Sequence, residues 1–120
     1  MVEHQTARLD GIFHALSDAT RREMLHTLSQ HERSVGELAA PFRMSLAAAS
    51  KHIKVLERAG LVRRNVQGRT HMCRLAPEPL SAVQEWLRFY ERFWTDRLDA
   101  LDALLQTEPP PPVRKKGSPR

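Results

Sequence analysis

The chain has 120 residues, of which 41% are hydrophobic and 28% are charged, and its net charge at pH 7 is +5. This length accommodates one small domain with a tail and excludes a multidomain enzyme, and the composition is that of a globular protein, not of a disordered or membrane chain. We expect neither a signal peptide nor a transmembrane helix, and therefore a cytoplasmic protein, because the first 30 residues contain charges and no continuous apolar stretch. A single cysteine, Cys73, excludes an intrachain disulfide.

The positive charge is concentrated in the middle of the chain. Residues 43–74 contain eight lysines or arginines against Glu57 alone, a net charge of +7, whereas residues 1–42 and 75–107 carry net charges of −2 and −3. A basic segment between two acidic ones is typical of a protein with one surface that meets a polyanion. The alternative is an ordinary solvated basic face.

The first 30 residues predict two helices. Apolar residues at helical spacing define one stripe of a helix over residues 6–16, and this stripe needs a partner to cover it: Leu9, Ile12, Phe13 and Leu16. Ser17, Asp18 and Thr20 then offer capping oxygens, and Thr20 with Glu23 forms a capping-box pattern for a second helix that ends near Ser29.

Two further helices follow, and the second of them has a basic outer face. Ser34 and Glu37 repeat the capping pattern before a short helix that Pro41 limits, and Ser45 is an N-cap for a fourth helix that ends at Gly60. On a helical wheel its buried side comprises Ala49, Ile53 and Leu56. The opposite side is small and basic, with His52 at its flank: Ala47, Ser50, Lys51, Lys54 and Arg58. A short helix, a tight connection and a second helix of this kind match the helix-turn-helix layout, in which the second helix enters the major groove.

After Gly60 the pattern changes to two strands, residues 61–66 and 70–75, around a connection that contains Gly68. This β-hairpin is a candidate wing. Four arginines on its strands and tip suit a phosphate backbone or a minor groove: Arg63, Arg64, Arg69 and Arg74.

Pro77 and Pro79 start a long helix that reaches Gln106, with one apolar stripe at alternating steps of three and four: Leu80, Val83, Leu87, Tyr90, Trp94, Leu98, Leu101 and Leu105. A second apolar edge comprises Trp86, Phe89 and Phe93. Because one small domain cannot easily cover both edges, we predict a homodimer in which this helix packs against its twin and against the stripe of the first helix. The alternative is a long helix lying on its own core.

The predicted architecture is therefore mostly α with a small β-hairpin: a winged helix-turn-helix domain over residues 1–107, which dimerises through its N- and C-terminal helices. Residues 108–120, with four consecutive prolines and four basic residues, predict a flexible basic tail.

Several segments, in this order and at fitting spacings, resemble the ArsR/SmtB family of bacterial winged-helix repressors. The segments are Ala15-Leu16-Ser17-Asp18-Ala19-Thr20-Arg21-Arg22-Glu23-Met24-Leu25, Gly36-Glu37-Leu38-Ala39, Ser45 to Leu56 with its Lys51-His52-Ile53-Lys54-Val55-Leu56 ending, Ala59-Gly60-Leu61-Val62 and Gly68-Arg69. The resemblance covers residues 5–106 and implies a dimer that binds an inverted-repeat operator and blocks transcription until a signal releases it.

Many members of that family sense metals, but this chain departs from both of their usual sites. Where the thiolate site has Glu-Leu-Cys-x-Cys, Glu37-Leu38 is followed by Ala39 and Pro41. The other site takes Asp and His from the terminal helices, and no histidine follows His71, which leaves Asp96, Asp99 and Asp102. Because zinc and related metals prefer imidazole or thiolate ligands, we predict no metal and no other cofactor, as in the metal-independent branch of the family.

The remaining reactive residues form no catalytic constellation. Ser45 and Ser50 lack a nucleophile elbow, and no phosphate loop or dinucleotide fingerprint is present, so we do not expect an enzyme. The other histidines have no ligand spacing and are typical of surface or packing positions: His4, His14, His26 and His31. Cys73 is interpreted as a small strand filler, with a redox switch as the alternative.

We therefore predict a sequence-specific regulator, acting as a repressor, whose partners are double-stranded operator DNA and a second copy of the chain; no membrane partner is expected. The predicted DNA-binding residues are Arg43, Ser45, Leu46, Ala47, Ser50, Lys51, His52, Lys54, Arg63, Arg64 and Arg69. The predicted dimerisation residues are Leu9, Ile12, Phe13, Leu87, Tyr90, Trp94, Leu98 and Leu101.

Two alternatives stay open. The apolar start of the fourth helix, residues 46–49, would serve a protein-interaction module as well as a DNA reader. An aromatic-lined pocket between the wing domain and the long helix would make the chain a sensor of an unidentified small-molecule effector, although such a cluster is more often plain core: Trp86, Phe89, Phe93 and Trp94.

Overall fold

The computed structural model describes the backbone of residues 2–107 and the side chains of residues 6–106. The chain forms two compact units with the boundary between Gln84 and Glu85. The expectation of one domain over residues 1–107 stays a prediction. The boundary falls within the long C-terminal helix, which continues from one unit into the other. The predicted tail, residues 108–120, lies outside the described residues.

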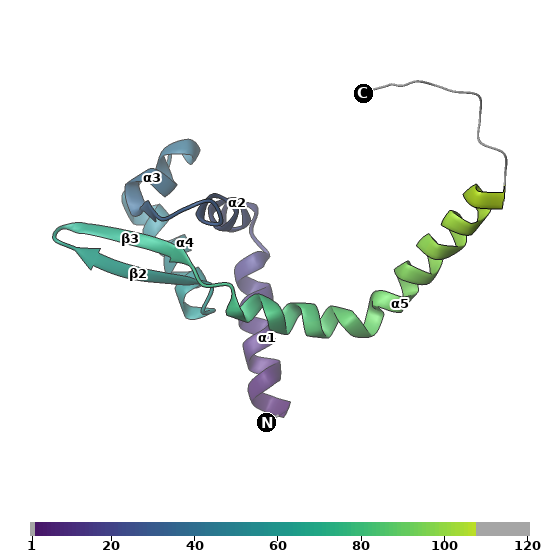
Figure 1. Ribbon diagram of the computed structural model, residues 1–120. Coiled ribbons are helices and arrows are strands. Elements are labelled where there is room, and N and C mark those ends of the chain that lie inside the picture. Colours follow the sequence, from purple (N-terminus) through teal and green to yellow (C-terminus); the bar gives the residue numbers. More distant parts are fainter. Residues whose placement is uncertain (1, 108–120) are drawn as a thin grey trace, which may run out of the picture. The chain divides into compact units, whose positions relative to one another are not determined.

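The elements confirm a mostly helical chain with a small antiparallel sheet (Figure 1). In chain order they are α1 (Val2–Leu16), α2 (Ala19–Leu28), β1 (Arg33–Ser34), α3 (Val35–Ala39), the 3-10 helix η1 (Ala40–Phe42), α4 (Leu46–Arg58), β2 (Val62–Gln67), β3 (Thr70–Leu75) and α5 (Glu78–Thr107).

Side-chain caps explain where α2 and α3 begin. The predicted capping box at α3 is confirmed, because the Ser34 hydroxyl accepts from the Glu37 N–H and the Glu37 carboxylate accepts from the Ser34 N–H. The latter bond is the main reason why the pKa of Glu37 lies below its usual value. At α2, however, the cap is Asp18, whose carboxylate accepts from the Arg21 N–H at 3.1 Å. The predicted Thr20–Glu23 box is therefore wrong: a helix capped by Thr20 would start at Arg21, whereas α2 starts two residues earlier, at Ala19.

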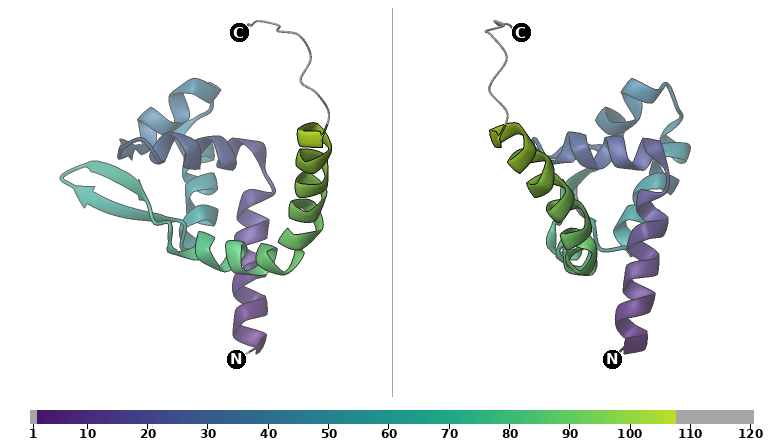
Figure 2. Two further views of the ribbon diagram at one scale, coloured as in Figure 1. Left: turned by 45° about the vertical axis from the view of Figure 1, so that its right-hand side comes forward. Right: turned by 90° about the vertical axis from the view of Figure 1, so that its right-hand side faces the viewer.

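The sheet has the strand order β1-β3-β2, and all its pairs are antiparallel. Gln67 pairs with Thr70, so the hairpin closes through two residues, and Gly68 has the positive φ of 65° that this turn requires. Figures 1 and 2 show the β2–β3 hairpin projecting beyond the helices of the first unit. The two-residue strand β1 was not predicted, since Arg33 and Ser34 show no strand pattern and pair only because β3 runs beside them.

The core lies between the helices and the base of the sheet. The predicted inner face of α4 is confirmed, because Ala49, Ile53 and Leu56 are fully buried. Ile12 is also fully buried: together with Ala15 it lies on the face of α1 that the core of its own chain covers. Its part in a dimer interface stays a prediction. Leu9 is half-buried and Phe13 is exposed.

The start of α5 packs on this core, through Leu80, Ala82 and Val83. From Glu85 to Gln106 every side chain of α5 is exposed, including the aromatic residues and leucines of both predicted apolar edges. No helix within residues 2–107 combines the length and the apolar character needed to cross a membrane.

Candidate nucleic-acid interface

The turn before α4 is built by backbone geometry and a side-chain cap. Arg43 has the left-handed φ of 54°, and its N–H donates to Ala40 O at the end of η1. Two residues later, the Ser45 hydroxyl accepts from the Ala48 N–H at 3.1 Å, which confirms the predicted N-cap of α4. A short helix, a tight turn and α4 therefore form a helix-turn-helix unit.

The outer face of α4 offers small side chains at its start and cations further on. Leu46, Ala47, Lys51, Lys54 and Arg58 are exposed, and Ser50 is half-buried. The first turns can therefore approach another surface closely, while the cations lie on the same side of the helix. This combination suits a helix that enters a groove of a polyanion.

The hairpin adds a second cationic surface. Arg63 and Arg74 lie directly opposite each other on β2 and β3, and both are exposed. Like charges in facing positions of a sheet repel each other, so a bound anion would relieve an unfavourable interaction here. Arg69, at the tip of the hairpin, is exposed as well.

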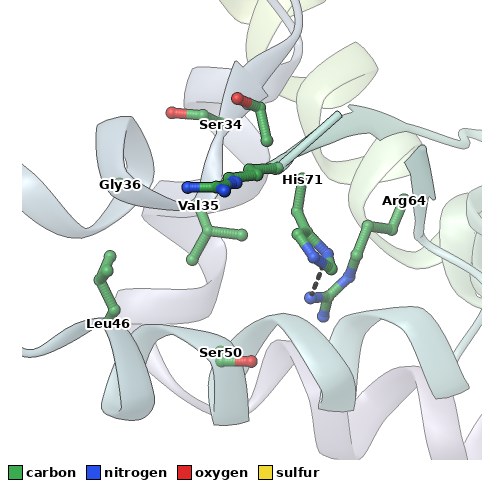
Figure 3. A pocket seen from close by; sticks show the side chains of 9 residues that line it. Ser34, Val35, Gly36, Leu46, Ser50, Arg64 and His71 are labelled. Carbon is green, nitrogen blue, oxygen red and sulfur yellow. Dashed lines mark hydrogen bonds between the residues drawn. The ribbon is translucent and has the colours of Figure 1, made fainter. Parts of the chain in front are cut away.

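A cleft of about 440 Å³ separates the start of α4 from the hairpin. Its lining combines cations and hydroxyls with two apolar side chains: Ser34, Val35, Gly36, Leu46, Ser50, Arg64, Arg69, Thr70 and His71. Figure 3 shows Leu46 and Ser50 on α4 facing the cleft, with Arg64 and His71 linked at its side. α3, α4 and the hairpin thus surround one concave, cationic surface.

Comparisons with other proteins identify this arrangement. A helix-turn-helix domain model matches residues 16–65. An HTH-type transcriptional regulator of Mycobacterium tuberculosis is 36% identical over 99 residues, which cover 82% of this chain and 90% of that protein. A crystal structure of an ArsR family transcriptional regulator superposes with a TM-score of 0.70 at 43% identity, over 75% of this chain and 93% of the other. The chain belongs to the ArsR family of transcriptional regulators.

A further relative of this ArsR-family protein is the transcriptional activator HlyU of Vibrio cholerae, which is 30% identical over 86 residues, 72% of this chain and 80% of the activator. Both relatives are named as proteins that regulate transcription, and the domain model that matches this chain is a helix-turn-helix domain. The expected class of protein is confirmed.

Arg64 differs in its surroundings from the other predicted wing cations of this ArsR-family protein. Its guanidinium donates to both carboxylate oxygens of Glu57, at 3.3 and 2.8 Å, and its Nη1 lies 3.4 Å from Nδ1 of His71. Only 15% of the Arg64 side chain is exposed. Arg64 therefore links α4 to both strands of the hairpin, a contact that sequence reasoning missed because Glu57 and Arg64 lie seven residues apart on different elements.

His52 also makes contacts within the fold. Its Nδ1 lies 3.2 Å from Nη1 of Arg21 and 3.9 Å from Oδ2 of Asp18, and 26% of its side chain is exposed. The expected phosphate contact of His52 stays a prediction. The sequence gives no local signal for these contacts, since Asp18 and Arg21 belong to a distant segment.

The other candidate residues do not converge on a second site. Within residues 2–107, no three side chains of His, Cys, Asp or Glu come together as a metal site. Cys73 is fully buried in β3, and this burial raises the pKa of its thiol. The aromatic side chains of α5 contact one another, with ring centroids 4.9 Å apart for Trp86–Tyr90 and for Phe89–Tyr90, and Arg92 lies over the rings of Phe89 and Phe93.

Proposed function

We propose that this regulator is a homodimeric, sequence-specific repressor that binds an inverted-repeat operator. The observation that carries the proposal is the outer face of α4, small at its N-terminal turns and cationic beyond them, next to an arginine-bearing hairpin. Double-stranded DNA has a major groove that admits such a helix and a phosphate backbone that attracts such cations. A DNA-bound role places the protein in the bacterial cytoplasm.

Each predicted contact has a chemical task. Ala47 and Leu46 would contact thymine methyl groups, Ser50 would hydrogen-bond to base edges, and Lys51 would bind guanine or phosphate. Cations outside the first turns of α4 would bind phosphates or the minor groove and would set the position of the protein along the DNA without reading its sequence: Arg43, Lys54, Arg63 and Arg69. With α4 in the major groove and the hairpin tip over the neighbouring minor groove, the backbone strand between these grooves would pass through the cleft.

The apolar side chains of α5 support a homodimer. On a helical wheel the exposed leucines and aromatic residues of α5 occupy about half of the circumference, and the acidic residues occupy the other side. A second copy of the chain is the partner that buries such a surface by symmetry, with α1 contributing the half-buried Leu9 and the exposed Phe13. Two subunits would present two α4 helices to half-sites about one helical turn apart.

We assign repression rather than activation on physical grounds. Occupying an operator needs only the DNA-binding and dimer surfaces just described, whereas activation needs a productive contact with the transcription machinery. Because the Vibrio cholerae relative is named an activator, the test is in vitro transcription from the bound promoter with and without the protein, and we expect the protein to lower the amount of transcript. A rise in transcript would overturn this part of the proposal.

Fluorescence anisotropy on duplex DNA tests the proposed function. A duplex is first enriched from a random pool by the wild-type protein, and a scrambled duplex of the same composition is the control. We expect tight binding to the enriched duplex, weak binding to the control, and affinities that fall steeply with salt. Failure to enrich any duplex, or binding that does not change with salt, would favour a protein-interaction module.

Two variants separate base reading from phosphate binding. Ser50→Ala should relax the preference at one base position, at a cost of about 1–3 kcal/mol on the preferred base. Arg69→Ala should weaken binding to both duplexes comparably and reduce the salt slope by about one. If Arg69→Ala leaves both affinities unchanged at moderate salt, the hairpin is not a DNA contact.

The proposal includes an unidentified small-molecule effector, to which we assign no binding site. Trp86 and Trp94 would report its binding, because a ligand near the aromatic cluster of α5 would change their intrinsic fluorescence. A panel of metabolites that leaves the emission unchanged would favour the interpretation of these rings as packing residues.

A further inference from the structure

Arg21 is the only buried charged residue among those whose side chains are described, residues 6–106, with 8% of its surface exposed. Burying a charge costs free energy unless hydrogen bonds and opposite dipoles compensate for the lost water. The contacts of this guanidinium therefore indicate why an arginine stands at this position.

The guanidinium first satisfies the C-terminal end of α1. Its Nε donates to Ala15 O at 2.7 Å, and its Nη2 donates to His14 O at 2.9 Å. The last carbonyls of a helix have no partner within the helix and form the negative end of its dipole. Arg21 thus holds the end of α1 by two charge-assisted hydrogen bonds.

The third contact of Arg21 reaches the DNA-reading helix. Its Nη1 lies 3.2 Å from Nδ1 of His52 on α4. A guanidinium can only donate, so this contact is a hydrogen bond in the tautomer of His52 whose Nδ1 accepts. His52 directly follows Lys51 in the sequence, and Lys51 is exposed on the outer face of α4.

We infer that Arg21 is a positioning residue for DNA recognition: it ties α4 to the end of α1 through His52 and so fixes how the outer face of α4 meets the major groove. The inference rests on the proposed function. Base contacts need side chains at defined positions, and a helix held before binding loses less freedom when it binds. Phosphate contacts by flexible lysines and arginines depend less on that placement.

Arg22 provides a matched control. It also lies in α2, and its Nη1 also donates to a carbonyl at the end of α1, Leu16 O at 2.7 Å. Arg22 is exposed, and its hydrogen bond to Leu16 O does not involve α4. Arg21→Met and Arg22→Met therefore remove the same charge from neighbouring positions, but only the first removes the link to His52.

At His52, two substitutions separate the hydrogen bond from the side-chain volume. Asn carries an amide oxygen at the position of Nδ1 and can still accept from Arg21, whereas Leu fills similar space without an acceptor. If His52 acts through Arg21, His52→Asn should retain most of the function that His52→Leu loses.

The experiment measures the ratio of the affinities for the enriched and the scrambled duplex, together with the salt slope, for each variant of the full chain. We expect Arg21→Met and His52→Leu to lower this ratio about tenfold, or about 1.4 kcal/mol. The ratio should stay near the wild-type value in Arg22→Met, and His52→Asn should retain more of it than His52→Leu does. Loss of the link between Arg21 and His52 should leave the salt slopes unchanged. The variant that combines Arg21→Met with His52→Leu should lower the affinity ratio no further than Arg21→Met alone, because both changes break the same link.

Three results would overturn the inference. Arg21→Met could retain the ratio, or Arg22→Met could lower it equally, which would assign the effect to charge alone. His52→Leu could weaken both duplexes equally and reduce the salt slope by about one, which would make His52 a phosphate contact. If circular dichroism shows that Arg21→Met does not fold, the comparison of His52→Leu with His52→Asn tests the link instead, because the side chain of His52 is partly exposed and its substitution disturbs the core less. Failure to enrich a duplex would instead refute the proposed function.

Discussion

Asp18 combines two tasks at the start of α2, as the N-cap of the helix and as a neighbour of His52. The hydrogen bond from the Arg21 N–H is the main cause that holds the pKa of Asp18 below its usual value of 3.8. The carboxylate therefore stabilises the fold above the unfolded-state pKa, and this contribution is lost as the pH falls through the lower folded-state pKa.

We predict that Asp18→Ala lowers the free energy of unfolding at pH 7 by about 0.5–2 kcal/mol, the usual cost of losing an N-cap. Asp18→Asn keeps a capping oxygen and should lose less at pH 7. Both variants should show a smaller difference than the wild type between pH 7 and a pH below 3.8, measured by urea unfolding. A wild-type pH dependence in Asp18→Asn would contradict this assignment.

Cys73 is the second residue whose environment sets its chemistry. It is fully buried, and burial raises the pKa of its thiol although the charge of Arg64 opposes the rise. Both effects of burial, a protonated thiol and no access, disfavour a redox switch at this position.

We predict that a thiol reagent such as a disulfide dye reacts slowly with the native protein at neutral pH and rapidly once the protein is unfolded in urea. Because Cys73 is the only cysteine, the colour change reports on this residue alone. A reaction in native buffer as fast as that of the unfolded chain would revive the redox hypothesis.

At the scale of elements, the ion pair between Glu57 and Arg64 links the end of α4 to the hairpin. Two hydrogen bonds to one carboxylate fix the guanidinium plane, and the side chains are 30% and 15% exposed, so solvent screens the pair only in part. We therefore expect this pair to help hold the hairpin against α4.

We predict that Glu57→Gln lowers the free energy of unfolding by about 1 kcal/mol and speeds amide hydrogen exchange in β2, because one partner loses its charge. Arg63→Gln is the control, since Arg63 is exposed on the same strand and faces Arg74; removing this like-charge repulsion should not speed the exchange. Equal exchange rates in Glu57→Gln and the wild type would show that the hairpin is held by its strand pairing and not by this pair.

At the scale of the whole molecule, the exposed half of α5 is the feature that one copy of the chain leaves unexplained. Leu98 and Leu101 are 60% and 52% exposed and lie on the predicted dimer stripe. Ala103 lies on the polar side of the same helix, about 200° from Leu101 on the wheel.

We predict that Leu101→Glu shifts the protein from dimer to monomer in sedimentation equilibrium, because dimerisation would bury the added charge against its symmetry mate. Ala103→Glu should leave the assembly unchanged. The monomeric variant should also bind the enriched duplex far more weakly, since one subunit reaches one half-site. A wild-type protein that sediments as a monomer, or a dimeric Leu101→Glu, would overturn the proposed arrangement.

The local patterns of the sequence predicted most elements, since hydrophobic periodicity and capping act over a few neighbouring residues. The inner face of α4, the caps at Ser34 and Ser45 and the hairpin with its glycine turn are confirmed. The start of α2 was placed wrongly, because Asp18 and Thr20 both offer a capping oxygen and sequence alone does not rank them.

Residue types at short spacings were enough to predict the helices, the hairpin, the basic middle segment and the family. Which side chains contact one another depends on how the elements pack in three dimensions. This packing buries Ile12 in the core, turns Arg64 towards Glu57 and brings Arg21 to His52 across 31 positions. Such contacts arise when distant segments pack together, and no local pattern encodes which charged side chain will meet which partner.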